Sequence, residues 1–155
     1  MTSRAWAGGL AVALLLVAGC GGDEPVVPPA DASDDERVRA TLGGVELVLE
    51  VADTVEERAF GLMERTSVPE GTGMVFLYDT PSEGRFYMFK VPIPLTAVFV
   101  RDGRVVSSVV MPPCEQSQPQ DCPTYGADGP FDTVVETDPA TLPDAQPGDE
   151  LVFSD

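Results

Sequence analysis

Side chains that commonly carry out catalysis or bind metals are scarce in this sequence, apart from carboxylates. Histidine is absent, which removes the most common general base and the most common transition-metal ligand. Ser-His-Asp and Cys-His catalysis are therefore excluded. The single lysine, Lys90, does not stand in a Ser-x-x-Lys motif, so a serine–lysine mechanism has no support. What remains is carboxylates, three cysteines and five methionines.

The carboxylates give the chain its unusual charge. Asp and Glu number 26 against 9 Lys and Arg, and the formal net charge is −17. Nucleic-acid binding needs clustered basic residues that displace counterions, and the densest basic feature is the pair Arg37 and Arg39. Nucleic acid is therefore excluded as a partner. The acidity is typical of a solubility device; cation binding is the alternative, although Asp121, Asp128 and Asp132 lack the spacing of a calcium loop.

The first twenty residues have the three parts of an export signal. Arg4 supplies a positive charge, residues 10–18 are apolar but short for a membrane span, and small residues precede Cys20. The ending Val17-Ala18-Gly19-Cys20 resembles the lipobox of bacterial lipoproteins, in which the cysteine is lipidated and becomes the new N-terminus. We expect residues 1–19 to be a signal peptide. An ordinary secretory signal with a chance cysteine is the alternative.

This signal predicts where the protein is found. The chain is expected to be exported and anchored to the cell membrane or outer membrane by lipid on Cys20, with its domain in the periplasm or outside the cell. Residues 20–40 are rich in Pro, Gly and acidic residues, a composition that buries too little apolar surface to fold. We expect them to form a disordered, solvated tether, followed by one globular domain over residues 41–155.

The two remaining cysteines, Cys114 and Cys122, form an even pair in a protein expected to be exported. Disulfides form and persist in such compartments. We expect a disulfide that closes the polar loop between them. A redox-active or metal-binding thiol pair is the alternative, but neither a Cys-x-x-Cys spacing nor a histidine supports it.

Short apolar runs predict a mainly β domain around these residues. Strict alternation over Val45–Val51 indicates a half-buried strand, and Asp102-Gly103 is typical of a hairpin turn. Asp53 and Thr54 precede Glu56 and Glu57 at capping-box spacing, which predicts a short helix. Its apolar face is expected to comprise Val55, Ala59, Leu62 and Met63. Further strands are expected at residues 74–78, 85–89, 95–100, 105–111, 134–136 and 151–153. The expected architecture is a β-sandwich or compact barrel with one short helix.

Several motifs occur in an order that is similar to a known family. They are Gly61-Leu62-Met63-Glu64-Arg65, Gly73-Met74-Val75-Phe76, Phe86-Tyr87-Met88, Pro94-Leu95, Pro113-Cys114, Cys122-Pro123-Thr124-Tyr125, Val135-Glu136 and Gly148-Asp149. With these motifs, residues 45–153 resemble the DUF192 family, a bacterial and archaeal domain of unknown function whose members are often exported or lipid-anchored. The resemblance implies a small, mainly β domain of jelly-roll or sandwich type, without an established enzyme activity or cofactor.

The resemblance also singles out Arg65, Met88 and Glu136 as candidate family-site residues. A carboxylate such as Glu136 inside a strand needs a partner if it is buried, and we expect Arg65 to be that partner. A purely structural ion pair is the alternative to a functional site. The sequence departs from the family pattern at Phe89, Lys90, Val91 and Thr96, where polar groups that would suit a ligand site are replaced or shifted.

Three functions remain open from the sequence. The favoured one is a non-enzymatic binding or accessory module of the cell envelope, which contacts a small ligand, a glycan or an envelope protein. The second is a hydrolase or lyase that acts on envelope carbohydrate through paired carboxylates. The third is a Ca²⁺- or Cu(I)-binding envelope protein, for which Met63, Met74 and Met88 could supply soft ligands. Core packing explains those methionines equally well.

Overall fold

The structure is a computed structural model that describes residues 36–154. The expected signal peptide, Cys20 and residues 21–35 of the expected tether lie outside the described residues. Within the described range, no helix is both long enough and apolar enough to cross a membrane.

Strands dominate the described chain, as the sequence predicts. The elements are β1 (Arg37–Leu42), β2 (Val45–Ala52), α1 (Val55–Phe60), β3 (Thr72–Ser82), β4 (Phe86–Tyr87), β5 (Leu95–Arg101), β6 (Arg104–Met111), the 3-10 helix η1 (Pro119–Asp121), β7 (Thr124–Tyr125), β8 (Phe131–Thr137) and β9 (Leu151–Ser154). The fold class is therefore mainly β with one short α-helix.

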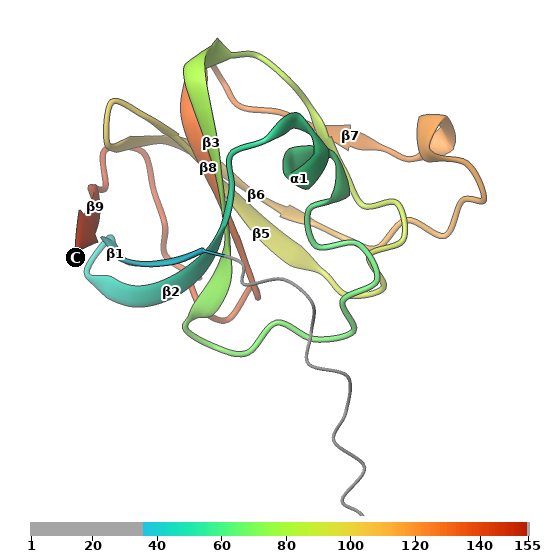
Figure 1. Ribbon diagram of the computed structural model, residues 1–155, viewed down its shortest axis with the longest axis horizontal. Coiled ribbons are helices and arrows are strands. Elements are labelled where there is room, and N and C mark those ends of the chain that lie inside the picture. Colours follow the sequence, from blue (N-terminus) through green and yellow to red (C-terminus); the bar gives the residue numbers. More distant parts are fainter. Residues whose placement is uncertain (1–35, 155) are drawn as a thin grey trace, which may run out of the picture. The chain divides into compact units, whose positions relative to one another are not determined.

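Seven of the strands form one curled sheet in the order β6-β5-β8-β3-β2-β1-β9 (Figure 1). All neighbours pair antiparallel except β2 and β3, which run parallel and are connected through α1. The two edges of the sheet meet at one end, where Arg104 bridges to Glu150 and the Leu151 amide donates to the Gly103 carbonyl over 2.8 Å. β4 and β7 form a separate two-stranded sheet.

The central strands β5, β8 and β3 are buried on both faces, which is why they consist of nearly continuous apolar residues. One face carries Val75, Val98 and Val135, together with the buried leucines of β1 and β2. The opposite face carries Phe76, Phe99, Phe131 and Val134, and it is covered by Leu62, Met88, Val91 and their neighbours. Figure 1 shows α1 lying on one side of this sheet.

The helix begins as its capping box predicts but packs differently. The Thr54 hydroxyl accepts from the Glu57 amide, and the Glu57 carboxylate accepts from the Thr54 amide. The expected apolar face is wrong, because α1 buries none of its residues and Val55 is 69% exposed. The helix ends at Phe60, so Leu62, which is buried, belongs to the turn that follows.

Two boundaries differ from expectation. β1 begins at Arg37, four residues before the expected domain start, because Ala40 and Leu42 are buried between β2 and β9. Residues 37–40 therefore belong to the sheet and not to a tether. The strand expected over residues 85–89 is reduced to Phe86–Tyr87, and a single bridge then joins Phe89 to Cys114.

Candidate functional site

The strongest candidate site is a cavity of about 170 Å³ between α1, β3, β4 and β8, which we call the Glu136 pocket. Its lining consists of Arg58, Ala59, Phe60, Gly61, Leu62, Met63, Phe76, Tyr78, Ser82, Gly84, Arg85, Phe86, Tyr87, Met88, Val91 and Glu136. Most of these residues are apolar or aromatic, and a few polar groups converge among them. That composition is typical of sites that bind small molecules.

Glu136 is the polar centre of the pocket. It is the next-to-last residue of β8 and is paired with Met74 on β3 and with Ala97 on β5, so that neighbouring strands enclose it on both sides. The residue is 5% exposed, and its carboxyl group forms no ion pair with any described residue. Burial raises the pKa of Glu136 to about 8. At neutral pH it is therefore mainly an uncharged carboxylic acid that can donate a hydrogen bond.

Aromatic rings form the apolar part of the pocket. The rings of Phe76 and Phe86 meet edge to face with centroids 5.3 Å apart, and Phe86 also contacts Phe99 at 5.7 Å. Such arrangements fix ring positions, because the edge of one ring is attracted to the face of the next. Met88 is 1% exposed and fills the space beside them. The apolar walls are therefore held in place before any ligand enters.

Two arginines stand among the lining residues. The Arg58 guanidinium lies 4.9 Å from the centroid of the Tyr78 ring, and its Nη1 donates to the carbonyls of Asp53 and Leu77. Arg85 donates from Nε to the Thr124 hydroxyl over 2.8 Å and from Nη2 to the Thr124 carbonyl over 2.7 Å. Burial raises the pKa of the Tyr78 hydroxyl; Arg58 opposes this rise, and Glu136 adds to it.

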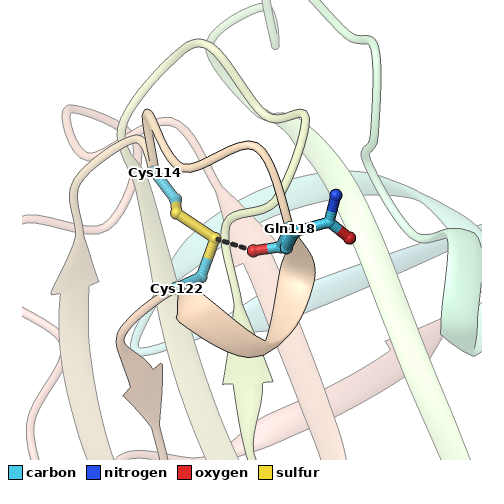
Figure 2. Close-up of a disulfide and its surroundings, with 3 residues drawn as sticks. All are labelled: Cys114, Gln118 and Cys122. Carbon is cyan, nitrogen blue, oxygen red and sulfur yellow. Dashed lines mark hydrogen bonds between the residues drawn. A yellow bond between two sulfur atoms is a disulfide. The ribbon is translucent and has the colours of Figure 1, made fainter.

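The disulfide expected between Cys114 and Cys122 is confirmed (Figure 2). The loop that it closes contains η1, and the Cys122 sulfur lies 4.0 Å from the Gln118 carbonyl oxygen. Cys114 bridges to Phe89, while β7, just after Cys122, pairs with β4. The disulfide loop therefore supports residues 86–89, the segment that supplies Phe86, Tyr87 and Met88 to the pocket wall.

The candidate residues Met88 and Glu136 both line this pocket, but Arg65 does not. The structure pairs Arg65 with Glu50 on β2, with Nη2 and Oε2 2.7 Å apart, so the expected Arg65–Glu136 ion pair is wrong. The segment that follows α1 carries Arg65 towards β2, where Glu50 also pairs with Arg37 at 3.6 Å. Arg65 and Met74 instead line a neighbouring surface depression.

The other candidate residues named from the sequence lie in different parts of the structure and do not form one site. Met63 lies in the pocket with Met88, whereas Met74 does not, so the three methionines do not form one site. Val91 lines the pocket, but Lys90 pairs with Glu64 at 3.6 Å and Thr96 is buried on β5. Within residues 36–154, no three His, Cys, Asp or Glu side chains are grouped as metal ligands.

Arg58, Tyr78 and Arg85 are pocket residues that the sequence did not identify as candidates. Each comes from a different part of the chain: Arg58 from the last turn of α1, Tyr78 from the middle of β3, and Arg85 from the loop before β4. No local motif connects them. Only the packing of α1 and β4 against one face of the sheet brings them together.

Comparison with known proteins identifies relatives of the whole described domain. The model of the DUF192 family, described as an uncharacterised ACR, matches residues 38–153. A protein of unknown function from Novosphingobium aromaticivorans DSM 12444 is 32% identical, with a TM-score of 0.63, and the match covers 79% of this chain and 89% of that one. None of the curated proteins compared with the chain matches it.

A second solved structure supports the fold alone. A protein described as a putative transcription regulator from Sinorhizobium meliloti 1021 superposes with a TM-score of 0.67 at 22% identity, covering 78% of this chain and 96% of that one. At this identity the likeness concerns the path of the backbone and not the activity.

Proposed function

The chain belongs to the DUF192 family, and from that starting point we propose that it is an exported, membrane-anchored module that binds a small molecule in the Glu136 pocket. The observation that supports this most is the buried Glu136 carboxyl group inside a cavity with aromatic walls. Desolvation in this mainly apolar pocket is costly for a carboxyl group that forms no ion pair with any described residue. A ligand that hydrogen-bonds to Glu136 relieves that cost.

The dimensions of the pocket favour a small ligand. A cavity of about 170 Å³ is close to the size of engineered cavities of about 150 Å³ that hold benzene. A glycan chain needs a long, open and polar groove, which this lining does not offer. Glu136 is also the one carboxyl group among the lining residues, whereas glycoside hydrolysis normally uses two. The pocket therefore supports binding better than carbohydrate hydrolysis.

A rim-blocking variant tests the binding function. Ala59 is exposed on α1 and lines the pocket, so Ala59→Trp should occlude the entrance without disturbing the core. Val55→Trp is the matched control, because Val55 is on the same helix, is 69% exposed and is not a lining residue. We expect a panel of benzene-sized compounds, assayed by ligand-observed NMR, to bind the unsubstituted chain and Val55→Trp but not Ala59→Trp. Equal binding by all three would contradict the proposal.

The anchoring part of the proposal rests on the leader and on Cys20, and it is tested separately. We expect the protein from native membranes to begin at Cys20 and to carry the mass of acyl chains. The variant Cys20→Ser should lack the mass of the acyl chains. An unmodified N-terminus, or cleavage elsewhere than before Cys20, would show that the protein is not a lipoprotein.

A further inference from the structure

We propose that the Glu136 pocket selects a small organic monoanion, with a carboxylate head bound by Arg58 and Arg85 and an apolar body of about benzene size. This inference rests on the proposed binding function and specifies its ligand class.

Ion pairing sets Arg58 and Arg85 apart from most other cations of this protein. With 26 acidic residues against 9 basic ones, nearly every cationic side chain should find a carboxylate. Among the described residues, Arg37, Arg65, Lys90, Arg101 and Arg104 do so. Arg39, Arg58 and Arg85 do not, and two of these three line the Glu136 pocket. Arg85 also lines a surface depression that includes Glu83 and Asp128, so it lies between that depression and the pocket.

Both guanidinium groups are held by neutral acceptors. Arg58 is fixed by the carbonyls of Asp53 and Leu77, and Arg85 is fixed by the hydroxyl and carbonyl of Thr124. These bonds position the groups without cancelling their charge. An arginine has five N–H donors in a planar fork, so each side chain keeps donors that can bind a carboxylate.

Glu136 fits an anionic ligand because of its protonation state. An ionised carboxylate at this position would repel a ligand carboxylate, but burial raises the pKa of Glu136 to about 8. The protonated acid donates an O–H···O⁻ hydrogen bond, which is among the stronger kinds. Arg58, Arg85 and the protonated Glu136 therefore all offer hydrogen-bond donors to an anion. An organic cation would be repelled by the two arginines.

The remaining lining residues suit the apolar body of the ligand. Phe76, Phe86 and Met88 are packed side by side and offer carbon and sulfur atoms but no hydrogen-bonding groups. A cavity of about 170 Å³ is too small to enclose a long acyl chain or a nucleotide. An aromatic or branched aliphatic acid of about six to nine heavy atoms matches this volume.

The test uses three ligands with the same ring: benzoate, benzyl alcohol and benzylamine. Each is titrated by calorimetry into the full chain in detergent at about pH 6, where Glu136 is protonated. We expect benzoate to bind at least about tenfold more tightly than benzyl alcohol, and benzylamine not to bind. Arg58→Gln and Arg85→Gln should each reduce the ratio of benzoate affinity to benzyl alcohol affinity at least about tenfold. Arg39→Gln is the control, because Arg39 forms no ion pair with a described residue and lies outside this pocket. It should change the affinity for neither benzoate nor benzyl alcohol.

The pH dependence provides a second readout. The titratable and charged groups around the pocket are Arg58 from α1, Tyr78 from β3, Arg85 and Tyr87 from the β4 region, and Glu136 from β8. Glu136 changes its charge between about pH 6 and pH 9, because burial raises its pKa to about 8. Benzoate affinity should fall by up to about tenfold per pH unit above pH 8, and Glu136→Gln, whose amide still donates, should remove this fall.

The outcomes separate the two proposals. If benzyl alcohol or benzylamine binds as tightly as benzoate, and Ala59→Trp blocks that binding, the pocket binds small molecules but the anion inference is wrong. If none of the three ligands binds, or if Ala59→Trp leaves benzoate binding intact, both proposals are overturned.

Discussion

The guanidinium of Arg58 lies 4.9 Å from the centroid of the Tyr78 ring, and its Nη1 donates to the Leu77 carbonyl over 2.8 Å. Arg58 therefore ties α1 to two consecutive residues of β3. This connection matters because α1 contributes no buried residue of its own. A six-residue helix is not stable by itself in water, so its position over the pocket depends on the capping box and on Arg58.

Removing that connection should destabilise the domain. For Arg58→Ala we expect the free energy of unfolding to fall by about 2 kcal/mol, because charge-assisted hydrogen bonds and a cation–π contact are lost together. Urea denaturation measures the change. Arg104→Ala is the control, since its partner Glu150 is 63% exposed and such pairs contribute less than about 1 kcal/mol. Equal effects of the two substitutions would show that Arg58 does not hold the helix.

At Gly73, β3 and β8 approach each other so closely that a side chain has no space. A Cβ atom at this position would collide with the backbone carbonyl oxygen of Glu136, which only a backbone shift could relieve. We expect Gly73→Ala to cost about 3 kcal/mol or more. Gly129→Ala is the control, because its Cβ would meet nothing closer than Val106 at 3.9 Å. Thermal unfolding of both variants measures the difference, and a Gly73→Ala variant as stable as Gly129→Ala would contradict the strand register described here.

Glu136 should make stability depend on pH. Its pKa is about 8 in the folded protein against an ordinary value of 4.5, so between these two values the folded state keeps a proton that the unfolded state has released. The contribution of Glu136 to stability is therefore fully present below about pH 4.5 and is lost as the pH rises towards 8, by at most about 1.4 kcal/mol per pH unit.

The comparison with Glu136→Gln isolates this contribution. The glutamine variant cannot ionise, so its stability relative to the unsubstituted protein should increase from about pH 5 to about pH 8 and then level off. Chemical denaturation at a series of pH values gives the difference. If the two curves stay parallel across that range, Glu136 is not buried in the way the structure shows.

The disulfide should stabilise both the fold and the pocket. Opening the short loop by replacing both Cys114 and Cys122 with Ser should lower the free energy of unfolding by about 2.5 kcal/mol on the chain-entropy model. Hydrogen exchange should also accelerate in residues 86–89, which Cys114 and β7 support. Acceleration confined to the loop itself would show that the pocket wall does not depend on the disulfide.

Local features of the fold were predictable from the sequence because neighbouring residues determine them. The capping box of Thr54 and Glu57 and the hairpin turn at Asp102 and Gly103 are confirmed; both turn residues have positive φ, 49° and 73°. Strands such as β5 follow from their runs of β-branched and aromatic residues. These interactions extend over a few residues, so the sequence alone contains the necessary information.

The site was predictable only in part. Glu136 and Met88 were identified through the family resemblance, but the choice of Arg65 as the partner of Glu136 was wrong, because Glu50 on β2 is nearer. Which cation approaches which carboxylate depends on how α1 and the following turn cross the sheet. The start of β1 at Arg37 was missed for a similar reason: its burial depends on β9, which comes from the opposite end of the chain.

The pairing of β1 with β9 also determines when the domain can finish folding. Leu42, which is fully buried, lies opposite Leu151 in this pairing, so β1 and β2 can form a hairpin early but leave one side of β1 open until the last strand is synthesised. Contacts between distant parts of a chain form late and slow folding. During synthesis, this strand order delays closure of the sheet until residues 151–154 have emerged, and the same delay applies to the export that we propose.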